Sequence, residues 1–133
     1  MRYLTVEEML EVNAEVMGGG HALRDGGLLE SAVVRPQASA FGVDAYPDLA
    51  GKAGAMLHSL VLNHDFVDGN KRTPVLATLV FIDLNGYVLR WDQDEALDFV
   101  LRLAMREISL DDVIAFLRVR MHPKALVDSD AAQ

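Results

Sequence analysis

The residues best suited to chemistry lie together in one nine-residue stretch, from His64 to Arg72. The stretch holds a histidine, two aspartates, a glycine, an asparagine and two adjacent cations. Helical patterns on either side place it between the end of one helix and the start of the next. A helix N-terminus presents free N–H groups and a partial positive charge, and Asn70, Lys71 and Arg72 would add donors and cations beside them. Since Gly69 allows a sharp turn and the close approach of a ligand, the sequence predicts a phosphate-binding loop.

Two further residues indicate what this loop does with a phosphate. Asp68 would repel a bare anion, but it fits a site in which Mg²⁺ bridges its carboxylate to the phosphates, and it also suits the N-cap of the following helix. His64 follows Leu57 and Leu60 at helical spacing, which predicts that it faces the core at the rim of the loop. From there its imidazole could remove a proton from an incoming hydroxyl. These residue types are typical of phosphoryl transfer, in which the protein mainly positions groups and neutralises charge.

Six helical patterns follow one another along the chain, with almost no strand-like alternation. They predict an all-α fold, a single-domain bundle of about six helices. Thr5 has Glu8 at capping-box spacing, and Ser109 is the expected cap of the last helix. The helix after the loop is apolar on nearly every side, so we expect it to be the buried central helix of the bundle. The expected helices span about 5–17, 25–36, 48–64, 70–85, 94–106 and 109–121, with a short extended link at 87–91.

The 133 residues fit one domain, which we expect to span residues 1–121, followed by a frayed tail at 122–133. The formal net charge is −8. Such acidity disfavours direct nucleic-acid binding, which depends on neutralising phosphates, and suits a basic protein partner. The chain has no cysteine, no signal-peptide core and no apolar run of the roughly 20 residues that cross a bilayer. We therefore expect a cytoplasmic protein that has no membrane partner.

The stretch from His64 to Arg72 resembles the signature of the Fic/Doc family, H-x-F-x-[D/E]-[G/A]-N-[K/G]-R. The match is specific because every one of the seven defined positions is met. The residues that carry it are His64, Phe66, Asp68, Gly69, Asn70, Lys71 and Arg72. The resemblance covers roughly residues 3 to 90, and four more stretches are similar to the Doc (death-on-curing) branch of the family: 24–32, 35–37, 46–49 and 84–87.

The resemblance implies a role for each residue of the loop. His64 would be the general base for a Ser, Thr or Tyr hydroxyl on a target protein, and Asp68 would hold Mg²⁺. Phe66 would anchor the loop in the core, while the residues after it bind the phosphates of ATP. The expected site residues are thus, as catalytic residues, His64, Asp68 and Arg72 and, as cofactor-binding residues, Phe66, Gly69, Asn70, Lys71 and Arg72.

Two positions separate this chain from most family members that transfer an adenylyl group. Those members carry Gly where this chain has Lys71, and a second Arg where it has Val75. Lys at the first position is similar to Doc-type members, which bind the nucleotide in the reverse sense and transfer its terminal phosphate. The resemblance thus implies a toxin that phosphorylates a translation factor, elongation factor Tu, and halts growth. The alternative is a Fic-type protein adenylyltransferase.

Partners and regulation are also implied by the resemblance. The family's inhibitory motif pairs Ser or Thr with Glu four residues later, and this chain has no such pair. Inhibition would then come from a separate, Phd-like antitoxin that covers the active-site groove. A flap that docks the target in extended form is expected within 42–47. Asp65 stands in the place usually held by Pro, and the opposing effects of this acid and the nearby cations on His64 leave its role open.

Two other functional classes remain as alternatives. The pair His64-Asp65 on a helical chain resembles metal-dependent HD phosphohydrolases, but the later aspartate would have to be Asp83, about 20 Å along the next helix. A non-catalytic corepressor of a DNA-binding antitoxin is the other alternative, although the intact signature argues against it. We expect His58 to be structural or exposed, and Arg35 to be a surface or salt-bridge residue.

Overall fold

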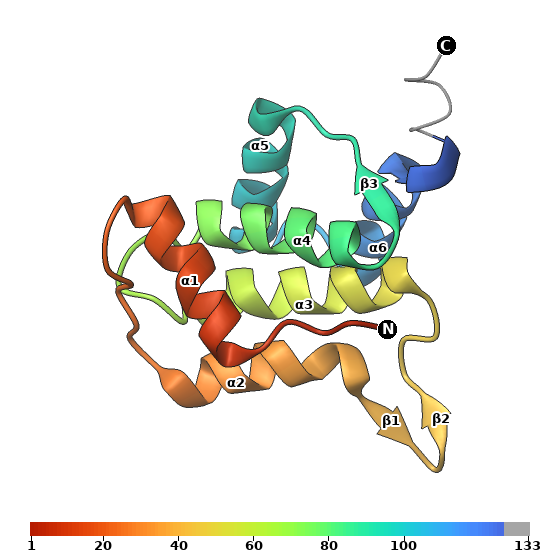
Figure 1. Cartoon of the computed structure of the whole chain (residues 1–133), viewed down its shortest axis with the longest axis horizontal. Coiled ribbons are helices and arrows are strands. Elements are labelled where there is room, and N and C mark those ends of the chain that lie inside the picture. Colours follow the sequence, from red (N-terminus) through yellow and green to blue (C-terminus); the bar gives the residue numbers. More distant parts are fainter. Residues whose placement is uncertain (127–133) are drawn as a thin grey trace.

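A computed structural model describes residues 1–126, and within them the chain is mainly helical, which confirms the predicted all-α fold (Figure 1). Its elements are α1 (Val6–Met17), α2 (Gly26–Val34), the 3-10 helix η1 (Arg35–Gln37), β1 (Ser39–Ala40), β2 (Val43–Asp44), α3 (Leu49–Asn63), α4 (Arg72–Leu84), β3 (Tyr87–Leu89), α5 (Gln93–Ala104), α6 (Leu110–Arg120) and β4 (Met121–Pro123). The strands form only two short antiparallel pairs, β1 with β2 and β3 with β4. No helix within residues 1–126 combines the length and the apolar character needed to cross a bilayer.

The helices begin where the local residue types predict. Thr5 and Ser109 cap α1 and α6, each in a capping box with the acidic residue three positions later. Asp25 and Asp48 accept backbone hydrogen bonds at the starts of α2 and α3. Each such cap satisfies an N–H group that the helix itself leaves unpaired, and is worth about 1 kcal/mol.

Of the two helices that flank the loop, α3 is the more deeply buried. Twelve of its 15 residues are buried, against seven of 13 in α4. Helix α6 crosses α3 closely at Gly54, where an added Cβ would lie 2.6 Å from Ile114. On α4, Leu76, Leu79 and Val80 are only partly buried. Helix α4 is still central, as predicted, because it contacts α1, α3, α5 and β3, but the elements within residues 1–126 cover only part of its apolar surface.

The C-terminal segment is more ordered than its composition predicts. β4 pairs with β3, and His122 lies opposite Val88. Beyond β4, the N–H of Lys124 donates to the carbonyl of Gly86 at 3.0 Å. The predicted frayed tail is thus corrected at 122–124, where backbone pairing holds the chain, and the part of that prediction at 127–133 lies outside the described residues.

Candidate active site

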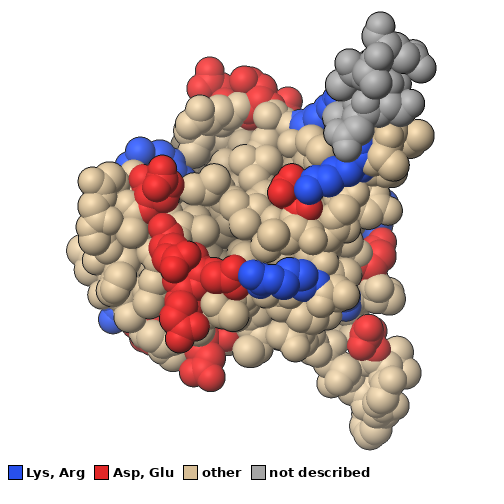
Figure 2. All heavy atoms as spheres, in the orientation of Figure 1, with Lys and Arg blue, Asp and Glu red and all other residues tan. Residues whose placement is uncertain are grey.

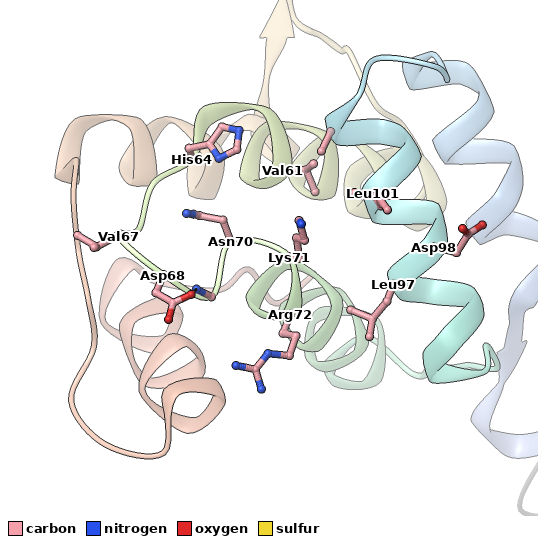
Figure 3. A pocket seen from close by; sticks show the side chains of 12 residues that line it. Val61, His64, Val67, Asp68, Asn70, Lys71, Arg72, Leu97, Asp98 and Leu101 are labelled. Atoms are coloured by element: carbon pink, nitrogen blue, oxygen red, sulfur yellow. Dashed lines mark hydrogen bonds between the residues drawn. The ribbon is translucent and has the colours of Figure 1, made fainter.

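The loop between α3 and α4 borders a cleft of about 630 Å³, with α5 on the facing side (Figure 3). All the predicted site residues except Phe66 line this cleft: His64, Asp68, Gly69, Asn70, Lys71 and Arg72. Phe66 is 2% exposed and belongs to the hydrophobic core. Its predicted anchoring role therefore fits, but its grouping with the cofactor-binding residues is corrected, because a core side chain does not reach a ligand in the cleft.

His64 ends α3 and turns away from the core. Its backbone is left-handed, with φ 51° and ψ 58°, so the helix stops there. The side chain is exposed, not facing the core as helical spacing predicts, because a left-handed residue leaves the helical stripe. Arg24 holds this turn: its Nε donates to the carbonyl of His64 at 2.7 Å and its Nη2 to that of Asn63 at 2.9 Å. In Figure 3, Asn70 and Lys71 lie between His64 and Arg72.

The loop is closed by backbone pairing and by one side-chain amide. Phe66 forms an antiparallel bridge with Leu23, and the N–H of Arg24 donates to the Asp65 carbonyl at 2.9 Å. The Asn70 amide pairs with both backbone groups of Phe66, accepting from its N–H at 3.0 Å and donating to its carbonyl at 2.6 Å. The predicted phosphate donor Asn70 thus uses one N–H to shape the loop and has a second N–H to offer a ligand.

Gly69 packs against a buried asparagine that the sequence analysis missed. Its φ is 80°, and an added Cβ would lie 2.9 Å from Nδ2 of Asn13 and 3.1 Å from Oγ1 of Thr73. Asn13, fully buried on α1, donates to the Asp68 carbonyl at 3.2 Å and to Thr73 Oγ1 at 3.0 Å. A signal was present in the sequence: Asn13 is a polar residue one turn after Met9 on the apolar face of α1. A buried amide needs partners, and here they come from the loop, from Thr73 of α4 and from the N–H of Ala22, which donates to Oδ1 of Asn13 at 2.8 Å.

The cations of the loop stand at the start of α4. Lys71 is the N-cap residue and Arg72 the first helical residue, and both side chains are exposed. The prediction of Asp68 as the N-cap is wrong, because its carboxylate accepts the N–H of Gly69 at 2.7 Å and the helix begins further along. Two cations beside the N–H groups of a helix N-terminus form a site suited to phosphates.

The donor set of the site suits a metal ion only together with a ligand. No cluster of three or more His, Cys, Asp or Glu side chains able to hold a metal occurs within residues 1–126. Asp68 nevertheless places one exposed carboxylate beside the phosphate-binding loop. Mg²⁺ is usually bound through one or two carboxylates together with substrate phosphates, so this single acid fits Mg²⁺ that arrives with a nucleotide.

Asp65 lies buried beneath the loop. Its side chain is 0% exposed, and neither carboxylate oxygen has a hydrogen-bond partner among residues 1–126. Burial raises the pKa of Asp65 to about 6, and the Arg24 guanidinium opposes that rise. His64 is exposed, so the acid and the imidazole occupy different sides of the chain. The charge of Asp65 therefore mainly affects the stability of the loop.

Two sequence-based hypotheses fail on distance along a helix. The β1–β2 hairpin, which holds part of the expected flap, precedes the N-terminus of α3, whereas His64 follows its C-terminus (Figure 1). The 15 residues of α3 span about 22 Å, so the hairpin lies far from the cleft. Asp83 lies near the end of α4, 3.0 Å from the Nζ of Lys124. It cannot share a metal with His64, which excludes the HD phosphohydrolase hypothesis.

Arg35 of η1 and His58 of α3 belong to a separate network. His58 has the structural role that was expected, whereas Arg35, expected at the surface or in a salt bridge, is half-buried and contacts α3. Nη1 of Arg35 lies 2.9 Å from Nδ1 of His58 and donates to Oγ of Ser59 at 2.7 Å. Burial and the Arg35 charge both lower the pKa of His58. Neither residue lines the cleft.

Comparisons with known proteins cover most of the chain. The model of the Fic/DOC family matches residues 3–82. The chain is 46% identical over 117 residues to "Toxin Doc" of Mycolicibacterium smegmatis, covering 86% of this chain and 90% of that protein. It is 31% identical over 121 residues to "Protein kinase doc" of Escherichia phage P1, covering 89% of this chain and 94% of that protein.

Proposed function

This chain belongs to the Fic/Doc family, and on that premise we propose that it is a Doc-like toxin that transfers the terminal phosphate of ATP to a hydroxyl of a translation factor in the cytoplasm. One observation carries the proposal: the exposed imidazole of His64 shares a cleft with the cationic start of α4. The expected target, by resemblance to the family, is elongation factor Tu, and the expected consequence is growth arrest.

The cleft contains a group for each task of the transfer. Lys71, Arg72 and the first N–H groups of α4 would bind and neutralise the phosphates. His64 would take the proton of the attacking hydroxyl, whose oxygen bonds to the terminal phosphorus while the bond to the bridging oxygen breaks and ADP leaves. Asp68 would hold Mg²⁺, which when bound supplies further charge neutralisation at the phosphates.

Lys71 and Val75 favour phosphate transfer over adenylyl transfer. Lys71 is exposed in the cleft where most adenylyl-transferring members carry Gly, and Val75, 7% exposed, stands where they carry a second Arg. A buried valine offers no charge to an α-phosphate. Incubation of a target protein with ATP labelled at the γ- or the α-phosphate separates the two reactions. Label from γ-ATP is expected, and label from α-ATP would instead identify an adenylyltransferase.

We also propose that a Phd-like antitoxin covers the cleft, because the chain has no inhibitory motif of its own. Helix α1 borders a groove that adjoins the cleft and a second groove that continues from the first, and Figure 2 shows acidic side chains gathered along this helix. A row of carboxylates suits a basic segment of the partner. The acidic residues of α1 are Glu7, Glu8, Glu11 and Glu15.

The test of the catalytic role is His64→Ala. We expect target phosphorylation to fall by about 10²-fold or more and growth arrest to disappear, because the general base is lost. His21→Ala removes another exposed histidine outside the cleft and is the matched control, with both effects retained. Growth arrest that persists in His64→Ala would instead favour a non-catalytic corepressor.

A further inference from the structure

A second cavity, of about 440 Å³, adjoins the active-site cleft between α1, α4 and the start of α5. We call it the α1–α4 groove. Arg72 and Leu97 line both the cleft and the groove, so the two are continuous. The groove also runs beside the part of α4 that the other elements leave uncovered, where Leu76 and Leu79 are only partly buried.

The lining of the groove combines an apolar surface with one aromatic ring and a few polar groups. Leu76 and Leu79 of α4 and Val16 of α1 form the apolar part, and the indole of Trp91 joins them. A planar base stacks well on an indole, and small-molecule sites are typically apolar with a few placed polar groups.

Two polar side chains at the groove match the remaining parts of a nucleoside. The amide of Gln93 can both donate to and accept from the edge of a base. The carboxylate of Glu15 can accept hydrogen bonds from ribose hydroxyls, but it would repel a phosphate. The nucleoside end of a nucleotide therefore suits this groove better than its phosphate end does.

We propose that the α1–α4 groove is the nucleoside subsite of the phosphate donor, with Trp91 and Leu79 contacting the base. This inference rests on the proposed function, since it assigns one part of the same ATP molecule. With the nucleoside in the groove, the phosphates pass Arg72, which lines both spaces, and continue along Lys71 toward His64. That direction brings the terminal phosphate closest to the imidazole.

The competing location for the base is the far wall of the cleft itself. That wall consists of Val61, Leu101 and Ala104, with Asp98 beside them. It offers aliphatic contact and a negative charge, without an aromatic ring or an amide. The groove is therefore the better match, and the two locations are separated by matched, uncharged variants: Leu79→Asn in the groove and Leu101→Asn in the wall.

The readout is the fluorescence of Trp91, because the chain contains a single tryptophan. We expect ATP with Mg²⁺ to change the Trp91 emission, and inorganic tripolyphosphate, which lacks a nucleoside, to bind without that change. Leu79→Asn should weaken ATP binding about tenfold and leave tripolyphosphate binding within about twofold, because base contacts of this kind are worth roughly a factor of ten. Leu101→Asn, which adds no charge to the cleft, should leave both affinities nearly unchanged.

Calorimetry on the same proteins measures the affinities for ATP and tripolyphosphate directly and identifies the results that would contradict the proposal. ATP that binds without altering Trp91, and that loses affinity only in Leu101→Asn, would overturn the groove assignment and leave the proposed function standing. The groove would then be available to a protein segment. If neither ATP nor tripolyphosphate binds, both the subsite and the proposed function are wrong.

Discussion

Both ends of α3 are flanked by one non-glycine residue and one glycine in the left-handed backbone conformation, but the surroundings of the two pairs differ. Phe41 (φ 54°) and Gly42 (φ 78°) form the turn between β1 and β2 before α3, and His64 (φ 51°) and Gly69 (φ 80°) belong to the loop after it. The hairpin is held at its foot, where the buried Lys52 donates to the Tyr46 carbonyl at 2.5 Å. At its tip, Phe41 is fully exposed, and no described atom lies within 4 Å of a Cβ added to Gly42.

In the active-site loop, by contrast, the two left-handed residues are in contact with other parts of the fold. Arg24 binds the carbonyl of His64, and Asn13 occupies the space that a Cβ on Gly69 would need. A non-glycine residue in the left-handed region costs roughly 1–2 kcal/mol. The hairpin tolerates that cost in a two-residue turn, whose twist favours positive φ. The loop tolerates it because contacts from α1 and from the segment before α2 hold it, so the strain of the loop is tied to the rest of the fold.

The largest expected effect on the free energy of unfolding comes from replacing Gly69 with alanine, and the same change at Gly42 is its control. Gly69→Ala adds backbone strain and a clash with Asn13 and Thr73, and should lower the free energy of unfolding by about 3 kcal/mol. Gly42→Ala adds only backbone strain and should cost about 1 kcal/mol. Urea unfolding of both variants measures the difference. Equal losses would contradict the conclusion that the loop is enclosed and the hairpin tip is not.

The second prediction concerns Asp65, a buried acid under the active-site loop that has no counterpart at the exposed hairpin tip. Asp65→Asn removes its charge. The pKa of Asp65 is raised by burial from 3.8 to about 6, so between these pH values the folded chain keeps a proton that the unfolded chain has released. The free energy of unfolding therefore falls as pH rises through this window and stays lowered above it. We expect the Asp65→Asn variant to be more stable than the parent by about 2 kcal/mol at pH 7, with a flatter profile between pH 4 and 6.

Urea unfolding at a series of pH values tests this expectation, and Glu8 provides an internal control. Its hydrogen bond with Arg2 lowers the pKa of Glu8 to about 2, so the stability that it contributes is lost only as pH falls below about 4.5. That acid limb should be the same in the parent and in Asp65→Asn. Parallel profiles from pH 4 to 7 would show that Asp65 is not the group that titrates.

The sequence predicted those parts of the site and fold that depend on neighbouring residues. The loop residues are contiguous, and the helix starts follow from caps such as Thr5 and Ser109, so both were accessible without a structure. The direction of His64 was not, because a left-handed residue interrupts the helical periodicity on which the prediction depended. Asn13 was missed because the two site residues that its amide N–H groups contact, Asp68 and Thr73, lie 55 and 60 positions away. The pairing of β4 with β3 was missed for the same reason, because a strand this short can be identified only from the distant strand with which it pairs.

The smallest expected effect is at the hairpin tip, where Phe41→Asn should raise the free energy of unfolding by up to about 1 kcal/mol. Asparagine adopts the left-handed conformation more readily than phenylalanine, and Asn-Gly is the preferred pair for this two-residue turn. No packing is lost, because the Phe41 side chain is 105% exposed. Urea unfolding measures the gain, and phosphorylation of the target should be unchanged, since the hairpin lies at the other end of α3 from the cleft. A loss of stability would mean that Phe41 supports the fold, and the two ends of α3 would then differ less than their surroundings indicate.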